Sequence, residues 1–268
     1  MLSHASLTNT KVVSTPLEIN VCLTPLDDTS LNDGTLYRQL VDSLVYLIVT
    51  RLNIAHVVHL VSQFLVALHS THYVVMLHIL YYIKGTMFHG LHFSAHSTLE
   101  LCSYSDSNWA GDPTDRRSTT GFCFFLGNYL ISWRNKKQYI VSRSSTKAEY
   151  RALADITFEL LTLHSLLEDM DLTHSSPTVI HCDNRSVIQI AYNNVFLERT
   201  KHIEIDYHLV RHHLCAGILR LVPVSPSNQI ADIFTKTFLL SRFLDLVSKL
   251  KMAFVLSLME DVNICIFI

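Results

Sequence analysis

Tyr104-Ser105-Asp106-Ser107-Asn108-Trp109-Ala110-Gly111 places one carboxylate, Asp106, at the end of an apolar run, just before the chain turns away. Three later carboxylates, Glu149, Asp183 and Asp232, also lie at the edges of predicted elements, each in a different part of the chain. Carboxylates that crowd together repel one another unless cations bind between them. Two Mg2+ ions can activate a water and relieve the charge of a phosphodiester. We therefore hypothesise that these four residues meet around divalent metal ions to hydrolyse a phosphodiester.

Each of the four carboxylates also has a purely structural interpretation, which the spacing alone leaves open. Glu149 stands three residues after a threonine and could complete a T-x-x-E capping box at the start of a helix. Asp183 could cap the helix that follows it, Asp232 could face solvent from a helix, and Asp106 could belong to a turn. Two further aspartates are assigned to a turn: Asp112 and Asp115.

The composition limits the class of protein. The chain has 268 residues, of which 49% are hydrophobic and only 16% are charged, against a typical charged share of roughly 25%. These values predict a globular chain with enough residues for two modest units. Because the net charge is only −2, any nucleic-acid binding must depend on a local basic patch rather than on a global field.

The cysteines and the apolar segments indicate the compartment. None of the six cysteines forms a C-x-x-C pair, and the start of the chain lacks the pattern of a secretory signal peptide. We therefore expect a reduced, intracellular protein of the cytoplasm or nucleus that is not secreted. Histidines and a glutamine interrupt the most apolar region, residues 54–83, so we expect buried amphipathic helices there and no membrane partner.

The first part of the chain predicts a small helical unit. Residues 1–30 lack sustained periodicity and are expected to form a poorly ordered lead-in. Apolar positions at helical spacing then predict helices that begin near residues 36 and 54, and a third over residues 71–84. Histidine pairs at helical spacing leave a zinc site open as an alternative, although no carboxylate or cysteine joins them: His56 with His59, and His69 with His72.

After residue 90 the hydrophobic period shifts towards two. An antiparallel meander followed by strand and helix units predicts an α/β fold with a mixed sheet and flanking helices. Asp106 and Asp183 are then expected to follow the ends of strands, where such sheets assemble sites. Strands are predicted over residues 99–104, 121–126, 129–133, 178–182 and 218–224, with helices over residues 146–168, from residue 184, over residues 203–215, and around Asp232.

Basic residues surround Glu149, which is the only acid between residues 134 and 151. A site that follows a nucleic-acid backbone requires such a patch, whereas a merely solvated charged face is the alternative. The residues of this basic patch are Arg134, Lys136, Lys137, Arg143, Lys147 and Arg151.

Short blocks of sequence follow one another in a recognisable order. They include Tyr104-Ser105-Asp106 with Trp109-Ala110-Gly111, Asp115-Arg116-Arg117-Ser118-Thr119-Thr120-Gly121, Ser144-Ser145-Thr146 with Ala148-Glu149-Tyr150-Arg151-Ala152, Cys182-Asp183-Asn184, Arg199-Thr200-Lys201-His202-Ile203, and Gln229 with Ala231-Asp232-Ile233-Phe234-Thr235-Lys236. Over about residues 95–240 these blocks resemble the ribonuclease H domain of copia-type LTR-retrotransposon Pol polyproteins. Upstream, Tyr82-Ile83-Lys84-Gly85-Thr86 and similar blocks resemble the C-terminal end of the reverse transcriptase in the same polyproteins.

The resemblance divides the chain into four parts. Residues 1–30 correspond to a lead-in or linker, residues 31–92 to a helical thumb/connection-like segment, and residues 241–268 to a C-terminal tail. Residues 95–240 correspond to a ribonuclease H-like domain with a mixed five-stranded sheet and flanking helices. The chain departs from the usual family sequence at Asp42 in place of glycine, at Thr50-Arg51-Leu52-Asn53 in place of Thr-Arg-Pro-Asp, and at Asn108 in place of a common second aspartate.

The resemblance also implies an activity. It implies an endonuclease that hydrolyses the RNA strand of RNA/DNA hybrids with two Mg2+ or Mn2+ ions, as part of a reverse transcriptase. Asp106, Glu149, Asp183 and Asp232 take the places of the catalytic, metal-binding carboxylates, and Lys201 joins the basic patch as a nucleic-acid-binding residue. Residues 223–230 contain no histidine, so proton transfer or product release would depend on water or on another group.

A noncatalytic or degenerate retroelement relic that at most binds nucleic acid is the alternative interpretation. We expect no polymerase activity, because the palm with its aspartate pair is missing from the sequence. In an intact polyprotein, the palm and fingers of the reverse transcriptase would be partners of this segment.

Overall fold

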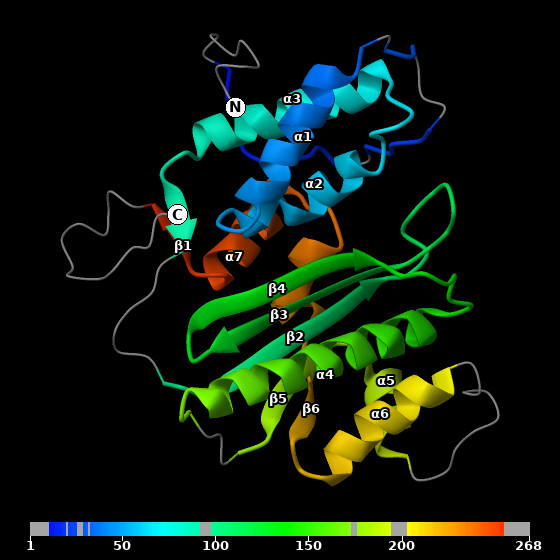
Figure 1. Ribbon diagram of the computed structural model, residues 1–268, viewed down its shortest axis with the longest axis vertical. Helices are drawn as coiled ribbons and strands as arrows, with labels where there is room; N and C mark the ends of the chain where they lie inside the picture. Colours follow the sequence, from blue (N-terminus) through cyan, green and yellow to red (C-terminus); the bar gives the residue numbers. More distant parts are fainter. Residues whose placement is uncertain are drawn as a thin grey trace. The chain divides into compact units, whose positions relative to one another are not determined.

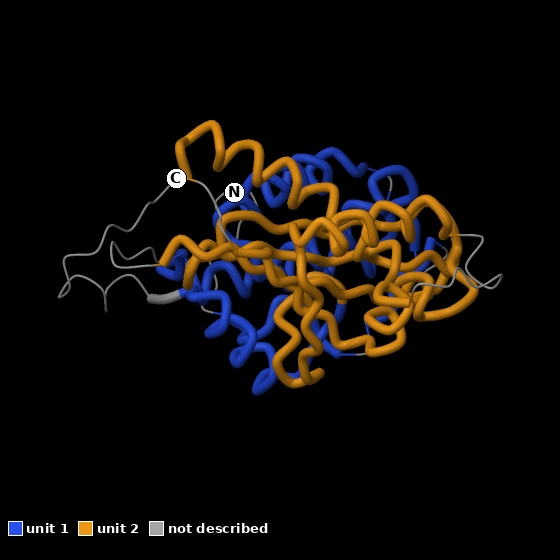
Figure 2. The backbone as a smooth tube through the Cα atoms, turned by 90° about the horizontal axis from the view of Figure 1, so that it is seen from below, with its two compact units in different colours: residues 1–95, 236–268 blue, residues 96–235 orange. Residues whose placement is uncertain are grey.

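The computed structural model describes residues 11–19, 21–25, 29–31, 33–91, 98–172, 176–193 and 203–254. The chain divides into two compact units, which Figure 2 shows in different colours. One unit, here called the sheet unit, is His96–Thr235, and the other, here called the helical unit, combines Met1–Ala95 with Lys236–Ile268. Each unit is described by itself.

A single five-stranded sheet organises the sheet unit (Figure 1). Its spatial order is β4-β3-β2-β5-β6, in which β2, β3 and β4 form an antiparallel meander, while β5 pairs parallel with both β2 and β6. The predicted α/β fold with a mixed five-stranded sheet is therefore confirmed. The strands are β2 Leu101–Asn108, β3 Thr119–Leu126, β4 Tyr129–Lys137, β5 Thr178–Cys182 and β6 Leu219–Pro223.

In the described part of the sheet unit three α-helices flank this sheet, and all three were expected from the sequence. They are α4 Ser145–Asp169, α5 Arg185–Tyr192 and α6 Glu204–Cys215. Helix α4 packs along β2 and β3 (Figure 1). Alternate residues of β3, Phe122 and Phe124, are buried in the same core as Leu153, Ile156 and Leu160 of α4. The period of two in the strand and the helical period of α4 thus bury matching faces. Each fully buried large apolar side chain stabilises the fold by about 1.5 to 3 kcal/mol.

Two features of the sheet unit differ from the sequence expectation. Strand β2 runs on to Asn108, so Asp106 lies within the strand and not after its end. The segment around Asp232 is a 3-10 helix, η4 Ile230–Phe234, preceded by another short 3-10 turn, η3 Pro226–Asn228. The helix expected around Asp232 is therefore present, but as a short 3-10 helix and not as an α-helix.

The helical unit contains the three helices expected from residues 36 to 84 and adds elements from the C-terminal part of the chain. Apolar side chains of α1, α2 and α3 fill its core, as expected for buried amphipathic helices, and include Leu40, Leu44, Val61, Met76 and Ile79. No helix in the described part of the chain is both long and apolar enough to cross a membrane. The elements are α1 Thr35–Leu47, η1 Leu52–Ile54, α2 Ala55–Ser62, α3 Ser70–Gly85, β1 His89–Leu91, α7 Leu240–Lys249 and β7 Met252–Phe254.

The described part of residues 241–268, the segment expected as a tail, returns to the helical unit. Strand β7 pairs antiparallel with β1, and Leu91 lies opposite Met252. Helix α7 buries Phe243, whose ring lies edge-on to that of Tyr82 with 5.8 Å between centroids. The helical unit is thus built from two stretches that are far apart in the sequence.

His72 is a buried histidine that serves the packing of the helical unit. The buried ring of His72 stacks on Phe64 at 3.9 Å between centroids, its Nδ1 accepts from the backbone N–H of His69 at 3.1 Å, and its Nε2 lies 3.0 Å from the Thr24 carbonyl oxygen. Among the residues that the structure describes, no group of side chains that could hold a metal contains a histidine. The zinc alternative is therefore contradicted for these residues.

A buried arginine marks a polar spot in the helical unit. Arg51 is only 5% exposed and donates to the carbonyl oxygen and hydroxyl of Thr86 at 2.6 and 2.5 Å. Burial lowers the pKa of its guanidinium, while the nearby Tyr82 hydroxyl opposes that shift. Asn53 is also buried and donates to the same Tyr82 hydroxyl. Arg51 Nε and Asn53 Oδ1 have no hydrogen-bond partner, so two polar atoms are unsatisfied around this cation.

We expect Asn53→Asp to stabilise the helical unit by about 1 to 3 kcal/mol, because a carboxylate can accept from the Tyr82 hydroxyl and neutralise the buried Arg51. Urea unfolding followed by far-UV circular dichroism measures the change. In an Arg51→Met background the same substitution buries an unpaired carboxylate and should instead destabilise the unit. Equal effects in both backgrounds would contradict the pairing.

Candidate active site

Asp106 lies inside strand β2 and is only 1% exposed, so its interpretation as a turn residue is wrong. It is directly opposite Gly121 of β3, which places both on the same face of the sheet. On that face the hydroxyl of Thr235 donates to Asp106 Oδ2. Asp106 is therefore a buried carboxylate that accepts from a hydroxyl in a distant part of the chain.

Asp183 directly follows β5, as predicted, and does not cap the next helix. Asn184 is the N-cap of α5, and its side chain accepts from the backbone N–H groups of Ser186 and Val187 at 3.1 and 3.2 Å. The half-buried Asp183 instead accepts from the side-chain amide of Gln229 at 3.3 Å. The asparagine satisfies the helix end, so the aspartate remains available for a site.

Glu149 is buried in helix α4 and does not belong to a capping box. The N-cap of α4 is Ser144, whose hydroxyl accepts from the backbone N–H of Lys147 at 3.3 Å. Glu149 stands five residues after this cap, beyond the position that a capping-box acid occupies. Its structural interpretation is therefore wrong, and its burial indicates another role.

Asp232 belongs to the 3-10 helix η4 and is 6% exposed, which contradicts the solvent-facing interpretation. Its carbonyl oxygen accepts from the backbone N–H of Thr235 at 3.0 Å and lies 3.1 Å from the Thr235 hydroxyl. The same threonine thus closes the turn that carries Asp232 and contacts Asp106. Two of the predicted site residues are connected through one side chain.

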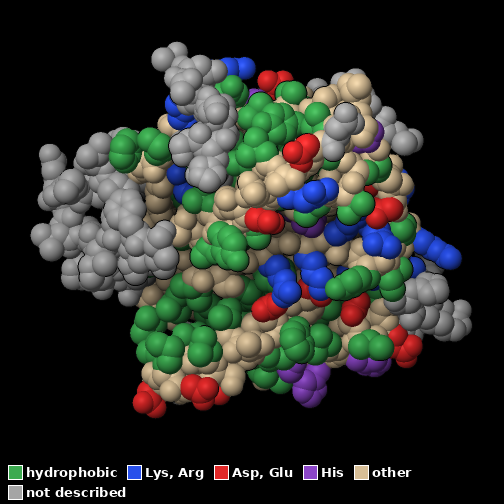
Figure 3. All heavy atoms as spheres, turned by 45° about the horizontal axis from the view of Figure 1, so that its top comes forward, with side chains coloured by type: hydrophobic (Ala, Val, Ile, Leu, Met, Phe, Trp, Pro, Cys, Tyr) green, Lys and Arg blue, Asp and Glu red, His purple; other side chains and the backbone are tan. Residues whose placement is uncertain are grey.

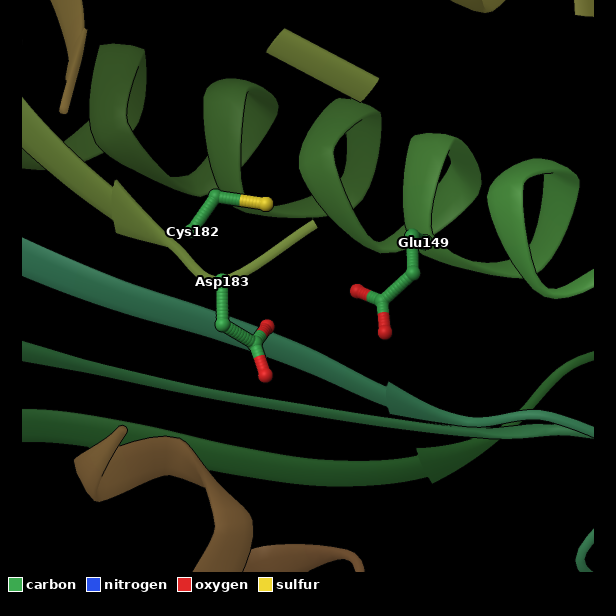
Figure 4. Close-up of side chains that lie close together, drawn as sticks. All are labelled: Glu149, Cys182 and Asp183. Atoms are coloured by element: carbon green, nitrogen blue, oxygen red, sulfur yellow. The ribbon is translucent and has the colours of Figure 1, made fainter. Parts of the chain in front are cut away.

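The structure brings the predicted carboxylates together in two overlapping groups. Oxygen atoms of Asp106, Asp183 and Asp232 all lie within 4.8 Å of one another. Asp183 also belongs to a second group, in which its carboxylate, that of Glu149 and the Cys182 sulfur meet the same limit. Figure 4 shows the Glu149 carboxylate extending from α4 towards that of Asp183. Asp183 is therefore shared by both groups.

An open pocket lies beside two of these carboxylates. A pocket of about 670 Å³ is lined by Glu149 and Asp183, by the first residues of α5, and by the loop that follows β6. The lining residues besides the two acids are Asn184, Arg185, Ser186, Pro223, Val224, Ser225 and Pro226.

The donor set fits a hard divalent cation. The group of Asp106, Asp183 and Asp232 offers carboxylate oxygens, which are the ligands that Mg2+ and Mn2+ prefer. Three carboxylates this close repel one another, and cations between them relieve that repulsion. Burial, reinforced by the charge of Glu149, raises the pKa of the Cys182 thiol well above its usual value. The neutral thiol is a poor ligand for a hard ion, so the oxygens define the site.

Two buried amides that the sequence interpretation left without a role support the carboxylates. Gln138 donates to the Thr120 hydroxyl at 3.0 Å and to the Ala148 carbonyl at 2.9 Å, and so links β3 to the residue before Glu149. Gln229 contacts Asp183 and stood in one of the recognisable sequence blocks. Long-range contacts of this kind leave no periodic signal, so only the block itself could have indicated them.

The basic patch is partly neutralised within the sheet unit. Arg134 contacts Glu159, and Lys137 pairs with Asp112 at 2.5 Å and Asp115 at 2.9 Å. The assignment of both aspartates to a turn is confirmed, since Asp112 accepts from the backbone N–H groups of Thr114 and Asp115. Figure 3 shows a face on which Lys and Arg side chains lie interspersed with acidic ones.

The other members of the basic patch differ in their surroundings. Lys136 Nζ lies 4.8 Å from the centre of the exposed Tyr139 ring, and Arg151 donates to the Ser142 hydroxyl at 2.8 Å. Both line a pocket of about 480 Å³ that also contains acidic residues of α4 and α6. Arg143 is exposed and Lys147 is partly exposed beside the start of α4. Lys201 lies outside the described residues.

Comparisons with known proteins agree with the sequence blocks. The chain is 40% identical over 250 residues to a retrovirus-related Pol polyprotein from transposon RE1 of Arabidopsis thaliana, covering 93% of this chain and 17% of that protein. It is 33% identical over 250 residues to the corresponding polyprotein from transposon TNT 1-94 of Nicotiana tabacum, covering 91% of this chain and 19% of that protein. The chain therefore spans less than a fifth of the length of these relatives.

No family model matches the chain. Among solved structures, it is similar to that of LC11-RNase H1, isolated from compost by a metagenomic approach, with 14% identity and a TM-score of 0.40. That similarity covers 52% of this chain and 94% of the other.

Replacement of Gly121 by alanine tests the close packing at Asp106. An added Cβ would lie 2.5 Å from Thr235 Cγ2 and 2.9 Å from Phe234 Cβ, so residues 234–235 must shift. We expect Gly121→Ala to destabilise the sheet unit by roughly 1 to 3 kcal/mol. Both tryptophans of the chain, Trp109 and Trp133, lie in this unit, so their fluorescence during urea unfolding reports on it.

Gly34→Ala is the matched control for this substitution. At Gly34 the nearest atom to an added Cβ is a leucine methyl at 3.3 Å, which can move at little cost. The control should leave the tryptophan transition unchanged. A transition at the wild-type urea concentration in Gly121→Ala would contradict the tight contact.

Proposed function

We propose that the sheet unit is a ribonuclease H-type endonuclease, in a chain that belongs to the Pol polyproteins of copia-type retrotransposons. It hydrolyses the RNA strand of RNA/DNA hybrids by a two-metal mechanism, as part of a reverse transcriptase. One observation carries this proposal: three buried or half-buried carboxylates from separate elements bring their oxygens within 4.8 Å of one another. Such an arrangement is costly in a protein unless cations bind to it.

The four carboxylates would together hold two Mg2+ or Mn2+ ions. Asp106, Asp183 and Asp232 form one close group, and Glu149 lies close to Asp183. When bound, the ions lower the pKa of a water and offset the charge that develops on the phosphate. The chain's own part is to fix the carboxylates in place. Thr235 donates to the Asp106 carboxylate and closes the backbone turn that carries Asp232, and Gln229 donates to the Asp183 carboxylate.

Water takes part in proton transfer in this proposal. Residues 223–230 contain no histidine, and residues 223–226 line the pocket beside Glu149 and Asp183. A pocket of this volume admits several waters next to the carboxylates. A proton can then reach the leaving oxygen from solvent without a side-chain acid in this loop.

The remaining basic residues would follow the backbone of the hybrid. Lys147 lies in the first turn of α4, the helix that carries Glu149, and Arg143 directly precedes the N-cap of that helix. Lys136 adds a further cation beside an exposed tyrosine. Phosphates attract such cations without regard to sequence. We place residues 95–240 in the nuclease domain, and residues 31–92 in the thumb/connection-like end of the reverse transcriptase.

Cleavage of a labelled RNA/DNA hybrid by the full chain tests the function. We expect cleavage of the RNA strand that requires Mg2+ or Mn2+ and that falls by about 100-fold or more in Asp106→Asn and Asp183→Asn, because each removes a charged metal ligand. The exposed Asp169 at the end of α4 offers a matched control, and Asp169→Asn should cleave as fast as the wild type. Unchanged rates in the site variants would refute the assignment, and hybrid binding without cleavage would favour the noncatalytic alternative.

The double variant Arg143→Ala/Lys147→Ala tests the nucleic-acid contacts. If both cations meet phosphates, the slope of log affinity against log salt should fall in magnitude by about 1 to 2. Fluorescence anisotropy of a labelled hybrid at several salt concentrations gives the slope. Arg134→Ala, which removes a guanidinium already in contact with Glu159, should leave the slope unchanged. The interface lies elsewhere if the double variant keeps the wild-type slope.

A further inference from the structure

Gln229 is a completely buried amide at the junction of η3 and η4. Its Nε2 donates to the Ser105 carbonyl oxygen at 2.9 Å and to Asp183 Oδ1 at 3.3 Å. Its Oε1 accepts from the backbone N–H of Ala231 at 3.3 Å. One side chain therefore joins β2, the residue after β5, and η4.

Each of these three partners is, or directly precedes, one of the three clustered aspartates. Ser105 directly precedes Asp106, Ala231 directly precedes Asp232, and Asp183 is contacted itself. A shift of any one of the three elements breaks a hydrogen bond of Gln229. The amide thus couples the positions of carboxylates that the sequence separates widely.

The orientation of this amide is fixed by its partners. One Nε2 hydrogen faces the Ser105 carbonyl oxygen, which can only accept. The other faces Asp183 Oδ1, which can only accept when that carboxylate is ionised, and Oε1 faces an N–H that can only donate. A flipped amide would place its oxygen against a carbonyl and a carboxylate. The hydrogen-bond network therefore leaves one orientation.

A neutral donor is suited to this position. It stabilises Asp183 without bringing a positive charge that would compete with metal ions for the carboxylates. An acid at this position would add a further negative charge and lose both donors. Groups that orient metal ligands from behind set the geometry of the ligands and the affinity for the metal.

We propose that Gln229 is a positioning residue of the metal site, which orients Asp183 and fixes the spacing of Asp106 and Asp232 without touching metal or nucleic acid. This inference rests on the proposed function and names the group that builds the site. It predicts that loss of the two donors weakens metal binding and turnover but not hybrid binding.

The test uses the full chain and three variants. Gln229→Glu keeps the shape and removes both donors, Gln229→Met removes them without adding charge, and Gln189→Glu makes the same charge change at an exposed position of α5. Mn2+ binding without nucleic acid is measured from the electron paramagnetic resonance signal of free Mn2+. Hybrid cleavage gives kcat and KM, and tryptophan fluorescence shows whether the sheet unit is folded.

We expect both Gln229 variants to have an affinity for Mn2+ that is reduced by about 10-fold or more. Their kcat should fall by a similar factor, while KM for the hybrid should stay unchanged. Gln189→Glu should match the wild type. Folded Gln229 variants with wild-type Mn2+ affinity would overturn the inference, whatever their stability. If the wild type binds Mn2+ but does not cleave, the proposed function fails while the comparison of Mn2+ affinities still decides the role of Gln229.

A measurement on the wild type covers the case in which neither variant folds. The side-chain amide resonances of Gln229 should shift on titration with Mg2+, because one of its hydrogens is bonded to a metal-binding oxygen. Absence of a shift at saturating Mg2+, or absence of any metal binding, would overturn the inference.

Discussion

The close approach of residues 230–235 to strands β2 and β3 is the constraint on which the carboxylate site depends. Gly121 leaves no Cβ in the way of Thr235 and Phe234, and the Thr235 hydroxyl reaches Asp106 across this gap. The sheet also holds the segment from two strands, since Asn108 and Asn135 donate to the carbonyl oxygens of residues 235 and 234. Asp232 is therefore brought to Asp106 by backbone contacts that do not depend on the charges of either aspartate.

Neutral side chains satisfy the structural demands around the site, and this is what leaves the carboxylates available. Ser144 caps α4, Asn184 caps α5, and Gln229 and Thr235 supply the donors to Asp183 and Asp106. An aspartate used as a cap would direct its oxygens to the helix N-terminus and would be less available to a cation. The separation of the two tasks explains how four acids can approach one another in a chain with so few charges.

The sequence predicted most of this architecture wherever the signal was periodic or local. The helical period of α4 and the alternation in β3 give the core, and turn chemistry gives the place of Asp112 and Asp115. The 3-10 form of η4 was missed, because its cap and apolar residues are equally those of a short α-helix. The pairing of Arg134 with Glu159 was missed as well, since a contact across 25 residues depends on the tertiary fold. The four acids were singled out because each stands at or near the edge of a predicted element, but only the resemblance to a known family joined them into one set.

The two asparagines that stand where the sequence resemblance implies aspartates, Asn108 and Asn53, have opposite structural consequences. Asn108 uses a donor that an aspartate lacks, because its Nδ2 binds the Thr235 carbonyl at 3.1 Å, where a carboxylate would face another acceptor. Asn53 instead leaves its own oxygen and Arg51 Nε without hydrogen bonds in the interior of the helical unit. Asn108 supports the segment that carries Asp232. Asn53 raises the free-energy cost of burying Arg51, a residue that is far in sequence from all four carboxylates. The unsatisfied atoms at Asn53 and Arg51 therefore affect the stability of the helical unit rather than the chemistry of the site.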